Sequence, residues 1–392
     1  MWAPTGAAFC TATLCNRIGS MLILAASLAL FVYGVINAML GTLMPTFKLT
    51  DAQDGTIALA QALGLVIASV SVGPLIDRRG KKVALLLGLT LIVIALFALP
   101  HATGDYALLM TFFLLLGVGG GIVVTGANML ASDVSDARRA SVLNILNLFF
   151  GLGGFATPFI MAHLLGGDPV RLCYMAAVLT VITLLINAIA KMPAPQPGAV
   201  ASEQGAVYTR PVLYLLALFL FFYVACEVGV WFWLNKYLIS RGVPEASALN
   251  ILSFGFALGL LFGRLVVSPI LIKVSSLNVT LASAVLMAAT TYLMLRTSDP
   301  TIAWVAVFCA GLAMAPVFPT ALAIVGDAFR VRTGTAMGFV ITCGWLGLAV
   351  SSPIIGYVAG RASLGSALLI LPAFSVAMIL VNLAIRPLVR TA

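Results

Sequence analysis

Twelve apolar runs, each about the length that crosses a bilayer, follow one another along this chain. A transmembrane helix needs roughly 20 predominantly apolar residues, whereas the strands of a membrane β-barrel alternate in polarity and span only about 10. Only 8% of the 392 residues are charged, against about 25% in soluble proteins, so the composition fits a lipid environment. The predicted helices cover residues 18–44, 55–76, 83–100, 106–131, 140–166, 171–190, 210–239, 246–271, 277–296, 301–326, 333–358 and 364–386.

The charged residues between the apolar runs predict how the chain is oriented. Residues 73–82 form a short hinge with four cations within five positions, and such cationic loops stay in the cytoplasm. With both termini in the cytoplasm, fifteen of the 21 Lys and Arg residues fall on the inner side. We therefore expect an integral protein of the plasma membrane (the inner membrane of a cell). The net charge of +9 then reflects topology and does not indicate nucleic-acid binding.

The sequence offers little for catalysis or metal binding. It contains two His residues, and its six Cys residues lack a second pair at zinc-ligand spacing. No His–carboxylate or Ser–His cluster appears in any span or loop, so we expect neither an enzyme nor a cofactor. Residues 1–17 carry no Lys or Arg before Arg17, and they are predicted to be a disordered cytoplasmic tail rather than a cleaved signal.

The chain repeats itself. Residues 192–209, the only long polar break, predict a flexible cytoplasmic linker between halves at 18–191 and 210–392. At an offset of 190, Phe31, Tyr33 and Gly73 fall on Phe221, Tyr223 and Gly263. At an offset of 194, Gly117, Asp133, Arg138, Leu152 and Gly153 fall on Gly311, Asp327, Arg332, Leu346 and Gly347. The repeat predicts an all-α membrane protein with twelve transmembrane helices in two pseudo-symmetric six-helix halves, and a binding site between them near the midplane.

Residues 73–82 resemble the signature loop between helices two and three of the major facilitator superfamily, in which a Gly precedes Asp-Arg-x-Gly and two cations. In that family the Asp bridges to helix eleven at the cytoplasmic gate, which implies gating roles for Asp77 and Arg78. In the second half Gly263 and Arg264 are similar to the signature, but Val267 stands in place of the Asp. The resemblance extends over nearly the whole chain and implies the major facilitator fold.

A second set of residues resembles the fucose permease group of sugar–proton symporters. The segment 223–229 with the following Trp233-Leu234 is similar to helix seven of that group. Further similar pairs and triplets are Phe318-Pro319-Thr320, Ala127-Asn128 and Leu143-Asn144. The coupling carboxylates of that group, in its first and fourth helices, align with Gly41 and Val124. Either coupling has moved elsewhere in this chain, or transport is uncoupled.

Glu227 lies near the middle of the predicted helix 210–239, where a carboxylate costs about 2.5–3.5 kcal/mol on insertion scales. A carboxyl group held away from water favours its protonated form, so Glu227 is the candidate proton-coupling residue. Residues at i, i+4 and i+8 share one helix face. Two such stripes are expected to face each other, Tyr33–Asn37–Gly41 and Tyr223–Glu227–Trp231–Asn235. The alternative is that Glu227 is only a structural hydrogen-bonding residue between helices.

Other polar residues extend the predicted site and the predicted gates. Amides both donate and accept hydrogen bonds, and Trp rings suit the apolar face of a sugar; the alternative is that the amides only join helices. The predicted substrate-binding residues are Tyr33, Asn37, Gln61, Asn128, Asn147, Tyr223, Glu227, Trp231 and Trp345. The predicted gating residues are Asp77, Arg78, Asp133, Arg138, Asp327 and Arg332, although solvated loop charges would look the same.

These patterns favour a monomeric secondary transporter that moves a small polar solute, interpreted as a sugar, by alternating access. Proton symport through Glu227 is one option. The alternatives are a drug or organic-anion carrier of the same superfamily and a non-transporting membrane receptor. A membrane-embedded cation would favour an anion carrier, but the sequence places Arg264 and Lys236 near helix ends.

Overall fold

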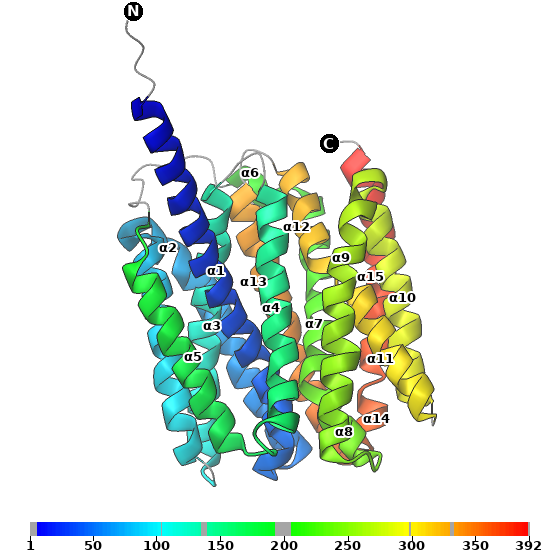
Figure 1. Ribbon diagram of the computed structural model, residues 1–392. Helices are drawn as coiled ribbons and strands as arrows, with labels where there is room; N and C mark the ends of the chain where they lie inside the picture. The colour runs from blue at the N-terminus through cyan, green and yellow to red at the C-terminus, as the bar shows by residue number, and fades with distance from the viewer. Residues whose placement is uncertain are drawn as a thin grey trace, which may run out of the picture.

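The computed structural model describes residues 6–102, 104–134, 139–192, 205–297, 299–329 and 333–390, and it is a bundle of long helices lying side by side (Figure 1). The described ranges contain no β-strand. The beginning of α1 and the end of α15 lie at the same end of the bundle. The elements are α1 (Gly6–Phe47), α2 (Asp51–Ala98), η1 (Leu99–Ala102), α3 (Tyr106–Val134), α4 (Arg139–His163), α5 (Pro169–Ile189), α6 (Gly205–Tyr208), α7 (Pro211–Ser240), α8 (Glu245–Asn250), η2 (Ile251–Ala257), α9 (Leu258–Lys273), α10 (Ser276–Arg296), α11 (Pro300–Met314), α12 (Val317–Ala328), α13 (Thr333–Arg361), α14 (Leu364–Ala367) and α15 (Ile370–Arg390).

Twelve segments of the described chain are long and apolar enough to cross a membrane, which confirms the predicted number of spans. The second and third spans both begin within α2. The eighth span consists of α8, η2 and α9, the tenth of α11 and α12, and the twelfth of α14 and α15. The spans in α1 and α7 are the most buried, at 72% each, so these two helices lie at the centre of the bundle.

The amino-terminal segment differs from its prediction. Helix α1 begins at Gly6, so residues 6–17 are helical and not a disordered tail. No Gly or Pro occurs between Gly6 and Gly19, and without these helix breakers the first span extends backwards as one helix.

Within the predicted charged hinge, residues 73–82, the helix α2 is interrupted at a single residue. Gly80 has φ 85° and ψ 162°, the one non-helical conformation inside α2. A positive φ is readily adopted by Gly, so this residue separates the second span from the third. On the far side of the hinge, Nζ of Lys82 donates to the carbonyl of Ala190 at 3.0 Å, which attaches the hinge to the end of α5. The side chains of Asp77 and Arg78 lie outside the described part of the chain.

The same close contact between two helices occurs once in each half. Gly153 of α4 packs on the carbonyl of Phe31 in α1, and Gly347 of α13 packs on the carbonyl of Phe221 in α7. A Cβ on either glycine would overlap the facing backbone. These contacts confirm the predicted offsets of 190 between the first and seventh spans and 194 between the fifth and eleventh.

The second and eighth spans are related by a different offset. Gly117 of α3 packs on the backbone of Gln61 in α2, and Gly311 of α11 packs in the same way on Phe256 in η2. Phe256 lies 195 positions after Gln61. The additional residues come from the longer end of α7, from a connection of four residues (241–244) where the first half has three (48–50), and from the π-helix η2. A π-helical turn inserts a residue into an α-helix.

This offset corrects the expected second copy of the signature loop. Gly263 corresponds to Ala68 and not to Gly73, because it packs on α11 as Ala68 packs on α3. Arg264 therefore corresponds to Ser69, inside the second span, and not to the charged hinge. The prediction that Gly263 and Arg264 repeat the signature was wrong.

The close contact at Gly347 predicts a large loss of stability on substitution. Gly347→Val places a branched side chain against the carbonyl of Phe221, which is backbone and cannot move aside. Overpacking of this kind costs about 1–3 kcal/mol or more, and we expect a lower thermal unfolding temperature in detergent. The matched control is Gly360→Val in the same helix, since nothing lies within 4 Å of a Cβ built there. Equal unfolding temperatures for the two variants would contradict the contact.

Candidate functional site

Polar and aromatic side chains of both halves meet between α1, α4, α7, α9 and α13. Tyr33 of α1 lies edge-on to Trp345 of α13, with ring centroids 6.4 Å apart. Tyr33 also stacks on the ring of Phe150 of α4, with ring centroids 5.4 Å apart. Glu227 of α7 is close enough to Tyr33 to act electrostatically on its hydroxyl group. We call the following residues the central cluster: Tyr33, Phe150, Tyr223, Glu227, Trp231, Arg264 and Trp345.

The carboxylate of Glu227 faces the interior of the protein. Its side chain is only 7% exposed, and Tyr223 and Trp231, one turn away on either side along α7, lie near its carboxylate. The hydroxyl of Tyr223 donates to the carbonyl of Met314 at 3.0 Å, which joins α7 to the end of α11. Arg264 of α9 supplies a positive charge that acts on Glu227.

Arg264 crosses from the second half to the first. It is 8% exposed, its guanidinium donates to the carbonyl of Asn147, and it lies over the ring of Phe150 at 5.8 Å. Leu271 ends the eighth span seven residues later, so Arg264 lies about 10 Å inside the span. The sequence-based placement of Arg264 near a helix end was wrong. The signal that could have found it is this spacing from the end of the apolar run.

Three polar atoms of the central cluster are buried and have no hydrogen-bond partner among the described residues: Tyr33 Oη, Glu227 Oε1 and Trp345 Nε1. Buried polar groups in proteins are nearly always hydrogen-bonded. The three atoms are an O–H donor, an N–H donor and a carboxylate acceptor. Together they can bind a ligand that both donates and accepts hydrogen bonds.

The two predicted stripes on α1 and α7 lie against each other. Gly41 packs on the backbone of Trp231 so closely that a Cβ would overlap it. Nδ2 of Asn235 donates to the carbonyl of Gly41 at 3.3 Å. Asn37, on the same face of α1, is 3% exposed. The structure thus brings together the stripes that the sequence placed in separate halves.

The remaining predicted binding residues lie in three places. Asn147 of α4 contacts the central cluster through its carbonyl, which accepts from Arg264. Asn128 of α3 is half-buried, and its side chain donates to the carbonyl of Val124 at 2.7 Å. Gln61 is buried in α2 beside α3, and its Oε1 has no hydrogen-bond partner among the described residues.

The predicted cytoplasmic gate falls largely outside the described structure. Arg138 and Arg332 lie outside the described residues, as do the side chains of Asp77, Arg78 and Asp133. Asp327, in the last turn of α12, is exposed. The gating roles of all six residues stay predictions.

A charged contact at the opposite end of the bundle was missed by sequence reasoning. Lys236 of α7 forms ion pairs with Asp51 and Asp54 of α2. The partners are more than 180 residues apart in the chain, so no local pattern connects them. The available signal was two carboxylates at the start of the second span and one cation near the end of the seventh, a helix that the repeat places beside the first half. Within the described ranges, no group of His, Cys, Asp and Glu could hold a metal ion.

Twelve segments long and apolar enough to cross a membrane, in two repeated halves with a polar cluster buried between them, are typical of membrane transport proteins. The sequence profile of the Major Facilitator Superfamily matches residues 22–271 and 244–392. The chain belongs to this family, whose members are transporters.

Relatives and solved structures agree with this assignment. The chain is 24% identical over 352 residues to the glucose/mannose transporter GlcP of Bacillus subtilis, covering 83% of this chain and 85% of that protein. It is 25% identical over 355 residues to the sodium-dependent glucose transporter 1A of Mus musculus, covering 78% and 81%. Its fold is similar to the nucleoside transporter NupG, with a TM-score of 0.76 at 16% identity and coverage of 94% and 99%. It is also similar to the fucose:proton symporter FucP of E. coli, with a TM-score of 0.68 at 18% identity and coverage of 93% and 98%.

Proposed function

We propose that this protein is a secondary transporter that moves a sugar or a similar small polar solute across the plasma membrane by alternating access. The observation that carries the proposal is the central cluster, where three buried polar atoms have no partner among the described residues. They come from α1, α7 and α13, and therefore from both halves. A solute bound to both halves is exposed to one side of the membrane or the other as the halves rock.

The chemistry of the central cluster suits a sugar. Each buried polar group left without a partner costs about 1–3 kcal/mol, and sugar hydroxyls both donate and accept hydrogen bonds. Trp231 and Trp345 combine an apolar ring with an N–H donor. The ring suits the apolar face of a sugar, and the N–H suits its hydroxyl groups. Two of the relatives, named as transporters of glucose and mannose and of glucose, support the same class of substrate.

Proton coupling through Glu227 is part of the proposal. With Glu227 ionised, Arg264 is held by the opposite charge; with Glu227 protonated, that attraction is removed and the guanidinium is released toward other partners. Binding of one proton to Glu227 therefore changes which hydrogen bonds the site can form. The excess of cations on the side of the termini supports a cytoplasmic location for both of them.

An organic-anion carrier is the second candidate, and Arg264 favours it. This guanidinium is buried, belongs to the central cluster and binds the carbonyl of Asn147 in the other half. Arginine binds carboxylates with two parallel hydrogen bonds. An anionic substrate would then compete with Glu227 for Arg264.

Uptake into proteoliposomes tests the proposal. The assay measures uptake with and without a proton gradient directed into the vesicles. The labelled compounds are glucose, mannose, fucose, a nucleoside and an aromatic carboxylate. We expect uptake of at least one neutral sugar, stimulated by the gradient. Uptake of the carboxylate alone would replace the sugar proposal by the second candidate, and uptake of none of the five compounds would contradict both.

A further inference from the structure

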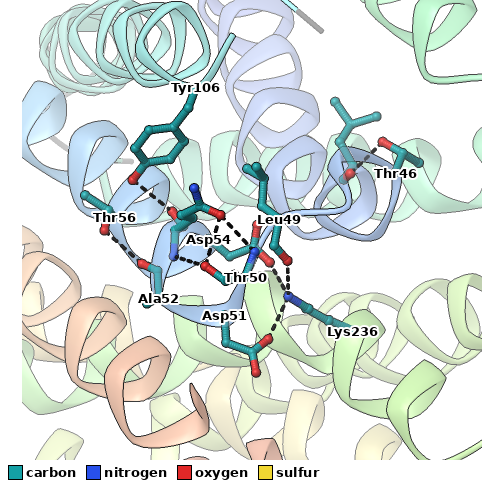
Figure 2. A network of polar contacts seen from close by, with 11 residues as sticks. Thr46, Leu49, Thr50, Asp51, Ala52, Asp54, Thr56, Tyr106 and Lys236 are labelled. Atoms are coloured by element: carbon teal, nitrogen blue, oxygen red, sulfur yellow. Dashed lines mark hydrogen bonds and ion pairs between the residues drawn. The ribbon is translucent and has the colours of Figure 1, made fainter. Parts of the chain in front are cut away.

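Three charged side chains join the two halves at the end of the bundle remote from the termini (Figure 2). Nζ of Lys236, in the last turns of α7, lies 2.7 Å from Oδ1 of Asp51 and also forms an ion pair with Oδ2 of Asp54. Both carboxylates belong to the first turn of α2. The same ammonium is 3.5 Å from the carbonyl of Leu49. We call Asp51, Asp54 and Lys236 the ion triad.

The ion triad has one negative charge too many. Among the described residues, one ammonium faces two carboxylates, and the charged groups that act on Asp54 are Lys236 and Asp51. Asp54 is fully buried, at 0% exposure, whereas Asp51 is 26% exposed. Oδ1 of Asp54 is buried and has no hydrogen-bond partner among the described residues. An ionised carboxylate left partly unsatisfied in a buried position is costly.

In the described parts of the neighbouring helices, no further charged group acts on Asp54. On α3, the hydroxyl of Tyr106 lies 3.5 Å from the carbonyl of Gln53, where it donates to the backbone. On α13, Ser352, Pro353 and Gly356 pack on Gly55 in this turn of α2, and none of these three residues is titratable. A proton on Oδ1 of Asp54 is therefore the simplest way to neutralise the surplus charge, while Oδ2 continues to accept from Lys236.

The ion triad lies at the end of the bundle where the two halves are in contact with each other. Beside it, Gly356 of α13 packs on the carbonyl of Asp51 so closely that a Cβ would not fit. A hydrogen bond of 2.6 Å between His163 of α4 and Asn250 of α8 joins the halves at the same end. Opening this end separates Lys236 from α2 and exposes Asp54 to water, where an ionised carboxylate is well solvated.

From this geometry we infer that Asp54 is a proton-binding site that loads when this end of the transporter closes and unloads when it opens. The site is separate from Glu227, which lies in the central cluster. The inference rests on the proposed alternating access of the two halves. The direction of the pH dependence follows from the charge count. The protonated triad is neutral and stable when buried, whereas the ionised triad favours exposure to water. Closure should therefore become more favourable as pH falls.

Spin-label distances across this end test the inference in the full-length chain. The labels are placed at Leu164→Cys after α4 and Ala362→Cys after α13, both exposed, with the six native cysteines replaced. In lipid nanodiscs we expect the ratio of closed to open populations to rise by up to tenfold for each unit that the pH falls within the titration range. Asp54→Asn should be closed at every pH. Asp51→Asn, which leaves a balanced pair, should lose the pH response in the same way.

Three further measurements make the outcome decisive. Lys236→Met, with two unpaired carboxylates, should shift the population toward the open form, and the exposed Glu245→Gln serves as the unaffected control. A pH-independent distance in the parent protein, or an open end in Asp54→Asn, would overturn the inference. Closure that follows sodium in place of choline at constant pH would assign the site to sodium instead of a proton. The distances are measured without substrate, so failure here is separate from failure of the uptake assay.

Discussion

Glu227→Gln is expected to abolish solute accumulation driven by a pH gradient while solute exchange continues. Glutamine keeps the volume of the side chain and, like the protonated carboxyl group, both donates and accepts hydrogen bonds, but it does not titrate. One unit of pH gradient contributes about 1.4 kcal/mol per transported proton, which is roughly tenfold accumulation. The parent protein should therefore accumulate solute about tenfold per pH unit if one proton is coupled, and the variant should only equilibrate it.

Exchange of labelled for unlabelled solute is the second readout for this variant. Exchange requires the halves to rock with the site loaded but needs no net proton movement, so it separates loss of coupling from loss of folding. Glu245→Gln, an exposed carboxylate in α8, is the matched control and should accumulate solute normally. Undiminished gradient-driven accumulation by Glu227→Gln would remove Glu227 as the coupling group.

Arg264→Met is expected to destabilise the protein more than most single substitutions. Arg264 and Glu227 are both buried and act on each other electrostatically, and removing one member of a buried charge pair costs about 3–5 kcal/mol. The double variant Arg264→Met with Glu227→Gln removes both charges, so its loss of stability should be clearly smaller than the sum of the two single losses. Thermal unfolding of the purified protein in detergent measures all three variants.

Arg241→Met is the control for this comparison. Arg241 follows α7, is exposed, and should change stability by no more than about 0.5 kcal/mol. Losses that simply add in the double variant would show that the two charges are not coupled, and the pairing inferred for the central cluster would then be wrong.

The helices were predictable because each depends on a local property. A continuous apolar run of sufficient length must form a helix in lipid, where every backbone group needs an internal partner. The stripes on α1 and α7 were likewise predictable, because Tyr33–Gly41 and Tyr223–Asn235 follow the spacing of one helix face. Their meeting followed from the repeat, which places the first and seventh spans in equivalent positions.

Arg264 and the ion triad were not predictable in the same way. An offset of 190 put Arg264 at the charged hinge, whereas the π-helix and the longer connection shift the eighth span and bring Arg264 into the interior. Lys236 forms ion pairs with Asp51 and Asp54 only because the fold brings the end of α7 to the beginning of α2.

The sequence by itself determined that the chain crosses the membrane twelve times, that it does so in two repeated halves, and that one carboxylate lies deep in the seventh span. Only the tertiary structure decided which charges act on each other: Arg264 on Glu227, and Lys236 on two carboxylates at the far end. The physical reason is that membrane insertion depends on the hydropathy of each segment alone, whereas charge pairing depends on the packing of segments far apart in the chain.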